Sequence, residues 1–211
     1  LLKNYSLLRI LQIIETKKLN LKGKSLEFGA SLNPKKNFSY FIKGINNFDY
    51  SNLNRTKSKK IIQVDLRKKF KIKSNTYNNI LIYNVLEHVD NHTITFNEIT
   101  RILNKNGNLF GSTPFLYQVH GAPKDYFRFT KDFFVEKLSK SGFNKVDIKC
   151  LGFGPFVVCF SIMQSYTKYL PLVNHIILPI CYLLDFILQK FIRTKLSEIY
   201  PIGIFFAAKI R

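Results

Sequence analysis

The stretch "NILIYNVLEHV", residues 79–89, decides the fold that the sequence predicts. It begins with a compact apolar run, which is typical of a β-strand buried on both faces. Apolar residues then recur at helical spacing over about residues 93–104, and "NG" at 106–107 is expected to end that helix. Because "NLFGSTP" at 108–114 reads as the next strand, this part of the chain is a strand–helix–strand unit.

Strands and helices alternate on both sides of this unit. Further strands are expected at "KSLEF" (24–28), "INNF" (45–48), "KKIIQV" (59–64), "NKVDIKCL" (144–151) and "YPIGIFFAAKI" (200–210). Helices are expected at residues 3–18 and 131–141, the second of them capped by Thr130. Such alternation predicts an α/β fold with a parallel sheet and helices on both faces.

Polar residues follow several of the expected strands. Glu27, Asp49, Asp65 and Asn84 fall at carboxyl ends of strands, where parallel sheets bind their ligands. Gly29 would let the backbone approach a ligand closely. Asp49 can accept hydrogen bonds from both hydroxyls of a ribose, and Asp65 can accept one from an adenine amine. The alternative is that strand-end acids only cap loops, but three acids in successive strands favour one binding site.

The loop "STPFLYQVHGAPKDYFRFT", residues 112–130, follows another strand end and concentrates reactive side chains. His120 is the candidate proton acceptor, because imidazole titrates near neutrality. Arg128 is suited to a phosphate or carboxylate of an acceptor, and Asp125 to orienting His120 or binding a sugar hydroxyl. Tyr117 and Tyr126 complete the expected acceptor side. The alternative is a structural loop in which Asp125 pairs with Arg128 while the aromatic residues pack.

The pattern "SLEFGAS…FDY…QVDL…NNILIYNVLEHV…EITRILNKNGNLFGSTPF" resembles the class I S-adenosylmethionine-dependent methyltransferases of the small-molecule type (type 11-like). The resemblance covers about residues 20–150. The extension "PFLYQVHGAPKDYFRFT…LSKSGF" resembles a branch associated with bacterial cell-surface polysaccharide and lipid-linked sugar pathways. The resemblance implies a Rossmann-like methyltransferase fold with an antiparallel last strand, and S-adenosylmethionine as the cofactor.

The resemblance also assigns cofactor contacts to this chain. They are Glu27, Gly29, Ala30, Ser31, Asp49, Asp65, Leu66, Asn84, Val85 and His88. For His88 a purely structural, hydrogen-bonded role is the alternative. Two departures from the family pattern stand out: Ser31 replaces a second glycine, and Asn79 replaces the usual acid before the fourth strand. No metal site is expected.

The length of 211 residues fits one methyltransferase-like domain. It would comprise an N-terminal helix (1–20), a cofactor-binding core (21–150), a hydrophobic helical insertion (151–198) and the last strand (199–211). Cys150, Cys159 and Cys181 show neither a zinc pattern nor a disulfide framework, and are expected to be reduced core residues of a cytosolic protein.

The formal charge of +20 suggests a nucleic acid or an anionic membrane as partner. A genome with AT-rich codons would also supply an excess of lysine. Dense basic runs occur only at "RTKSKK" (55–60) and "RKKFKIK" (67–73), and both are expected to be solvated loops. With no RNA-binding module in the sequence, nucleic acid is not the expected partner.

Residues 150–193 are rich in apolar and aromatic side chains but contain Asn174, Asp185 and Pro179. Three interpretations remain open: a pair of core helices, an interfacial element touching the membrane through 153–193, or a membrane span. The expected location is therefore the cytoplasm, including the inner face of the cytoplasmic membrane.

The function expected from these features is methyl transfer to a sugar, or to another small or lipid-linked acceptor of the cell envelope. The alternatives are a basic RNA-binding or RNA-modifying protein, and a catalytically inactive methyltransferase-like scaffold. The sequence carries no indication of the oligomeric state.

Overall fold

The fold is a layered α/β structure built on one sheet. The computed structural model describes residues 5–210 apart from 45–46, 55–60, 122–123 and 168–170. Within these residues, seven strands form a sheet in the order β3-β2-β1-β4-β5-β7-β6. Strands β1 to β5 pair in parallel, and β7 runs antiparallel to both β5 and β6. The predicted Rossmann-like fold, with its antiparallel last strand, is confirmed.

The elements have the following bounds. The strands are β1 (Ser25–Phe28), β2 (Phe48–Asn52), β3 (Ile61–Gln63), β4 (Tyr77–Tyr83), β5 (Leu103–Pro114), β6 (Phe143–Leu151) and β7 (Gly203–Ile210). The α-helices are α1 (Leu7–Thr16), α2 (His92–Ile102), α3 (Lys131–Lys140), α4 (Pro155–Thr167), α5 (Pro171–Gln189) and α6 (Leu196–Ile199). Short 3-10 turns are η1 (Pro34–Lys36), η2 (Ser39–Phe41) and η3 (Leu86–His88).

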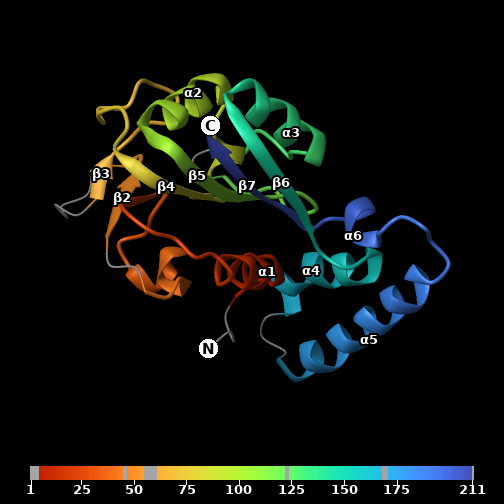
Figure 1. Cartoon of the computed structure of the whole chain (residues 1–211). Helices are drawn as coiled ribbons and strands as arrows, with labels where there is room; N and C mark the ends of the chain where they lie inside the picture. The colour runs from red at the N-terminus through yellow and green to blue at the C-terminus, as the bar shows by residue number, and fades with distance from the viewer. Residues whose placement is uncertain (1–4, 45–46, 55–60, 122–123, 168–170, 211) are drawn as a thin grey trace.

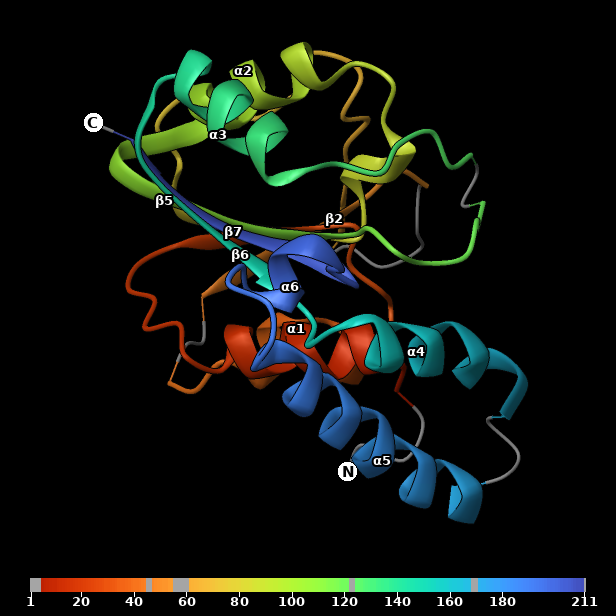
Figure 2. The ribbon, with the colours of Figure 1, turned by 90° about the vertical axis from the view of Figure 1, so that its right-hand side faces the viewer.

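Helices cover both faces of the sheet (Figures 1 and 2). Helices α2 and α3 lie on one face, and α1 and α4 lie on the other, with α5 outside α4. The first side packs a cluster that includes Phe96, Phe134 and Phe206. The second packs a cluster that includes Ile13 and Val157. Burial on both faces explains why residues 80–83 of β4 form a continuous apolar run.

Local chemistry sets several helix ends. The Ser6 side chain accepts a hydrogen bond from the Arg9 N–H and so caps α1. Thr130 caps α3 by accepting from the Phe133 N–H, as the sequence predicted. The chain leaves α3 through Gly142, whose φ of 94° is the left-handed conformation that glycine adopts without strain.

Two predicted boundaries are wrong. Helix α2 ends at Ile102, and the "NG" at 106–107 lies inside β5, where the β4–β5 register shifts. Strand β2 begins at Phe48 and continues to Asn52, so Asp49 is its second residue rather than the residue after its end. Residues 45–46 of the expected strand, and the basic run 55–60, lie outside the described residues.

The hydrophobic segment forms α4 and α5. Val157 and Phe160 of α4 are buried against the sheet side of the molecule, whereas most apolar residues of α5 are exposed. The core-helix interpretation therefore holds for α4 alone. None of the helices in the described residues is long and apolar enough to cross a bilayer. The three cysteines are free thiols, but they are half-buried or exposed rather than core residues.

Candidate active site

A cavity of about 640 Å³ opens at the carboxyl ends of β1 to β4, where the sequence placed the site. We call it the cofactor cavity. It is lined by Phe28, Gly29, Ser51, Asn52, Leu53, Asn54, Val64, Asp65, Leu66, Arg67, Asn84, Val85, His88, Val89, Lys124 and Tyr126. Its volume is in the range of sites that enclose a small molecule or cofactor. Six predicted cofactor residues line it, namely Gly29, Asp65, Leu66, Asn84, Val85 and His88.

Gly29 supplies the close backbone approach that the sequence predicted. Its φ is 70°, and a Cβ at this position would lie 2.4 Å from Cγ2 of Val85. Both the conformation and the space therefore demand glycine. The turn keeps the backbone of β1 open to the cavity.

Asn84 lines the cavity and is held from behind by buried polar groups of α1 and β5. Asn84, directly after β4, adopts a φ of 52°. Its side chain exchanges two hydrogen bonds with Gln12 of α1, at 2.7 and 3.0 Å, and Gln12 also donates to the Ser112 hydroxyl. Gln12 is fully buried. The sequence analysis missed it, although a glutamine in the apolar stripe of a helix is a signal for a buried polar contact.

Asp65 reaches the cavity from the loop after β3. It accepts two hydrogen bonds from the Arg67 guanidinium, both at 2.9 Å, and one from the Arg67 backbone. The pairing with Arg67 lowers the pKa of Asp65. The residue is therefore a carboxylate at the mouth of the cavity, where oxygen lone pairs remain for an incoming donor.

Asp49 does not reach the cavity. Its carboxylate accepts from the Tyr77 hydroxyl at 2.8 Å and pairs with Lys24 at 2.9 Å, near the amino ends of the strands. The prediction that Asp49 lies at a strand tip is wrong, because β2 continues to Asn52 and Asp49 pairs with Leu26 inside β1. Asn52 occupies the tip of β2 instead and lines the cavity.

Glu27, Ala30 and Ser31 lie beside the cavity without lining it. The buried carboxylate of Glu27 accepts from the backbone N–H groups of Phe38 and Ser39 and so holds the turn η2. Burial raises its pKa. The Ser31 backbone N–H donates to Asn37, so replacement of a glycine by serine is accommodated in the turn. These three residues shape the loop after β1.

The other departure, Asn79, is remote from the cavity. It is buried at the start of β4, donates to the Lys22 carbonyl and the Ser25 hydroxyl, and accepts from Asn108. An amide satisfies both donor and acceptor partners there, which a carboxylate could not do. The departure at Asn79 therefore leaves the cavity unchanged.

A second cavity, of about 430 Å³, lies under the loop that follows β5. We call it the loop cavity. It is lined by Phe115, Leu116, Tyr117, Gln118, Val119, Asp125, Tyr126, Phe127, Arg128 and Ile162. Tyr126 lines both cavities, so the two are neighbours. The predicted acceptor residues Tyr117, Asp125, Tyr126 and Arg128 are thus gathered around one space.

Asp125 and Arg128 form the pair that the structural alternative predicted. Two guanidinium nitrogens of Arg128 donate to the two carboxylate oxygens at 2.5 and 2.7 Å, and Arg128 also donates to the Gln118 carbonyl. This bidentate contact lowers the pKa of Asp125 to about 2. Arg128 still lines the loop cavity, so acceptor binding by it stays a prediction.

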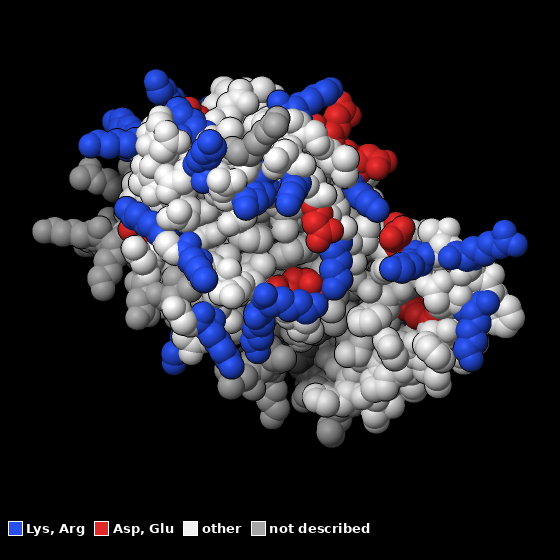
Figure 3. Space-filling view, in the orientation of Figure 1, with Lys and Arg blue, Asp and Glu red and all other residues white. Residues whose placement is uncertain are grey.

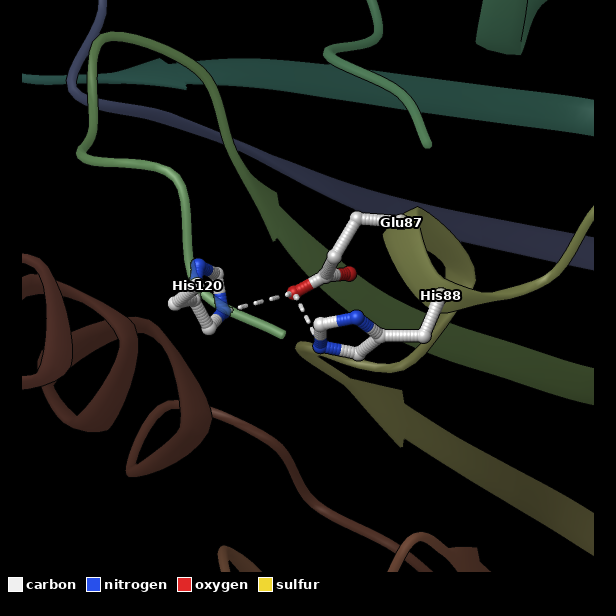
Figure 4. Close-up of side chains that lie close together, drawn as sticks. All are labelled: Glu87, His88 and His120. Atoms are coloured by element: carbon white, nitrogen blue, oxygen red, sulfur yellow. Dashed lines mark ion pairs between the residues drawn. The ribbon is translucent and has the colours of Figure 1, made fainter. Parts of the chain in front are cut away.

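Glu87, His88 and His120 meet between the two cavities (Figure 4). Oε1 of Glu87 lies 3.8 Å from Nε2 of His88 and 3.9 Å from Nε2 of His120. Glu87 is completely buried, and among the described residues neither of its carboxyl oxygens has a hydrogen-bond partner. Burial raises its pKa to about 8, with a further contribution from the charge of Asp125. The sequence analysis did not select Glu87.

The other ring nitrogens of both histidines face oxygen acceptors. Nδ1 of His88 lies 2.6 Å from the Lys124 carbonyl. Nδ1 of His120 lies 3.3 Å from the Gln118 carbonyl and 3.4 Å from Asp125 Oδ2. These contacts assign the proton to Nδ1 in each ring and leave the Nε2 lone pairs directed at Glu87. His88 combines a structural hydrogen bond with a place in the cavity wall.

Within the described residues, these three side chains are the group with metal-ligand chemistry, since their ligand atoms lie within 4.8 Å of one another. Two ligands that share an ion through bonds of about 2.1 Å lie roughly 3.0–3.4 Å apart. The separations of 3.8 and 3.9 Å are wider than that. The arrangement as it stands is an acid–base cluster.

Comparisons with known proteins agree with this geometry. Residues 42–111 match the family model described as a methyltransferase domain. No curated protein sequence matches the chain at a comparable level. Phosphoethanolamine N-methyltransferase 2 of Haemonchus contortus, solved with S-adenosylhomocysteine, is 14% identical with a TM-score of 0.57, and the alignment covers 96% of this chain but only 52% of that one.

Two further solved structures align with this chain over nearly their full length. A methyltransferase of Archaeoglobus fulgidus is 12% identical with a TM-score of 0.58, over 96% of this chain and 92% of that one. One of Mesorhizobium loti is 11% identical with a TM-score of 0.56, over 99% of both chains. Residues 42–111 therefore resemble a methyltransferase domain, and the whole chain shares the fold of these S-adenosylmethionine-dependent methyltransferases.

Proposed function

We propose that this chain transfers a methyl group from S-adenosylmethionine to a hydroxyl of a sugar, or of a related small or lipid-linked acceptor of the cell envelope. The observation that carries the proposal is the pair of adjacent cavities with a shared wall at Tyr126. One cavity has the place and lining of a nucleotide-type site, and the other is lined by aromatic and polar side chains suited to a sugar.

The cofactor cavity offers matching contacts for each part of the cofactor. In this proposal Asn52 would hold a ribose hydroxyl, and Asp65 with Leu66 would border the adenine; all three residues line the cavity. Gly29 and Asn84 border the opposite end. When bound there, S-adenosylmethionine supplies an electrophilic methyl group on a sulfonium.

A hydroxyl acceptor must lose its proton as it is methylated, and in this proposal His120, which lies between the two cavities, takes it. Its Nε2 carries a lone pair, and its ring contacts both Tyr117, which lines the loop cavity, and His88, which lines the cofactor cavity. The proton passes from the hydroxyl oxygen to Nε2. The Asp125 carboxylate, 3.4 Å from Nδ1, stabilises the imidazolium so formed.

Cofactor binding is tested by calorimetric titration with S-adenosylmethionine. Gly29→Ala places a methyl group against Val85 and is expected to abolish binding. Asp49→Ala is the matched control, because Asp49 lies near the amino ends of the strands and away from the cavity. This variant should bind the cofactor as the wild type does. Absence of binding in folded wild-type protein would refute the proposal.

Acceptor chemistry is tested by formation of S-adenosylhomocysteine with a panel of nucleotide-linked and lipid-linked sugars. His120→Gln should lower turnover by about 10²–10⁴-fold while cofactor affinity stays close to that of the wild type. His175→Gln, on α5 and outside both cavities, is the matched control. Equal turnover in the two variants would remove His120 from the mechanism.

A further inference from the structure

Helix α5 turns two of its polar side chains, Asn174 and Asp185, towards α4. Asp185 is only 3% exposed, and its carboxylate accepts from the backbone N–H groups of Phe156 and Val157, at 3.0 and 2.9 Å. It therefore caps the start of α4 from a neighbouring helix. Asn174 likewise exchanges hydrogen bonds with Thr167 at the end of α4. These two polar residues hold α5 to α4.

The apolar stripe of α5 consequently faces outward. It presents, with their exposed fractions, Ile176 (64%), Ile180 (51%), Leu183 (55%), Phe186 (55%) and Ile187 (44%). The spacing of three and four residues places them along one side of the helix. Asp185 is the only charged residue between 174 and 189, and it points the other way. This is the reverse of a helix that packs on a globular core.

Helix α4 extends the apolar surface towards the site. Ile162 (43%), Met163 (58%) and Tyr166 (79%) are exposed on it. Ile162 also lines the loop cavity, and Ser165 donates to Gln118 of the loop. The apolar surface and the acceptor side of the site are therefore joined. We call the exposed residues of α4 and α5 together the apolar face.

Basic residues lie at one end of the apolar face, after the C-terminus of α5. Lys190, Arg193 and Lys195 follow α5 directly and are exposed. Figure 3 shows the lower right of the molecule, where α5 lies, almost without charged side chains, and basic side chains at its right-hand end. An apolar strip bordered by cations is complementary to a bilayer with anionic headgroups. A second copy of this chain would carry the same net charge of +20, so long-range repulsion disfavours it as the occupant.

We propose that the apolar face docks on an anionic membrane surface, with α5 lying in the plane of the interface. Lys190 and Arg193 contact the headgroups, while Ile180, Leu183 and Ile187 enter the acyl boundary. The loop cavity then opens close to the lipid surface. Docking does not depend on the proposed activity, but it would give a lipid-linked acceptor direct access.

Vesicle co-sedimentation tests the docking. The full chain should bind vesicles of phosphatidylcholine mixed with phosphatidylglycerol at low salt, and bind pure phosphatidylcholine weakly. Ile180→Gln with Leu183→Gln should abolish sedimentation, because both side chains are exposed and lose no core packing. Ile94→Gln with Val135→Gln makes the same change on exposed positions of α2 and α3, on the other side of the sheet, and should bind as the wild type does.

The basic contribution is tested in the same assay. Lys190→Gln with Arg193→Gln should weaken binding about 25-fold, at roughly 1 kcal/mol for each charge. Lys71→Gln with Lys73→Gln changes the net charge equally in a loop away from α5 and should have a much smaller effect. Equal effects of the two pairs would overturn the role of Lys190 and Arg193.

Insertion is tested with a single fluorophore, since the chain contains no tryptophan. Emission of Phe186→Trp should shift to shorter wavelength with the anionic vesicles, and Val135→Trp should not respond. Absence of vesicle binding would overturn the proposal, as would a dimer in sedimentation that Ile180→Gln with Leu183→Gln dissociates. Urea denaturation of the same samples shows that each variant is folded. Cofactor titration separates failure of docking from failure of the proposed activity.

Discussion

The contact between Asp185 and the start of α4 gives the sharpest test of how the two hydrophobic helices are held. In Asp185→Ala, the N–H groups of Phe156 and Val157 lose their acceptor in a place that water reaches poorly. Each unsatisfied buried donor costs about 1–3 kcal/mol. The variant no longer buries a carboxylate, and this offsets part of the cost of the two unsatisfied donors. We expect a net loss of about 2–3 kcal/mol in the free energy of unfolding.

Urea denaturation measures this loss, with an unchanged slope as the sign that the native surface is the same. Asp132→Ala, in the exposed first turn of α3, is the control and should cost less than about 1 kcal/mol. Gly154→Ala attacks the same contact from the other side, because its Cβ would lie 2.6 Å from Cγ of Asp185. If Asp185→Ala costs no more than Asp132→Ala, the helix cap is not what fixes α5.

Three further predictions concern the loop, the cluster and the sheet. The Arg128 contact holds the pKa of Asp125 at about 2. The wild type should therefore be more stable than Arg128→Met by about 2 kcal/mol at neutral pH. In an acid titration, this difference in stability should vanish as the pH falls from about 4 to 2. Burial raises the pKa of Glu87 to about 8. The stability of the wild type should therefore decline as the pH rises from about 4.5 to 8. In denaturation experiments over this pH range, Glu87→Gln should show a smaller decline. Gly111→Ala would place Cβ 2.3 Å from Cζ of Phe206 and should lower the melting temperature, at a cost of about 1–3 kcal/mol.

The strands that the sequence predicted best are those whose burial is two-sided. The apolar run of β4 leaves little choice of conformation, and its flanking turn and helix are local features. Strand β2 was misplaced because it is short, polar and only partly buried. Its register depends on pairing with β1. Asp49 is held by Tyr77 and Lys24, and both of these partners are distant from it in sequence.

Glu87 shows a different limit of sequence reasoning. In the sequence it is an acid in a turn, where solvent exposure is the ordinary expectation. Its burial comes from the loop that crosses above it, in which the Tyr126 N–H donates to the Glu87 carbonyl. The sequence indicated that this loop borders a site, but the distance between His120 and Glu87 is set by tertiary packing alone.

Helix α5 was ambiguous for a third reason. The sequence separates a polar from an apolar side, but it does not say which side faces the protein. Pairing of Asp185 with the start of α4 resolves this, since two backbone donors attract the carboxylate inward.

The position of β7 between β5 and β6 has a consequence for synthesis of the chain. Strand β6 pairs with β7 and, in the described part of the molecule, with no other strand. The ribosome makes α4 and α5 after β6 but before β7, so both helices emerge while the sheet is still open at that edge. The nascent chain therefore exposes its most apolar segment before its core is complete. A nearby membrane surface would cover that segment during this interval and so reduce aggregation.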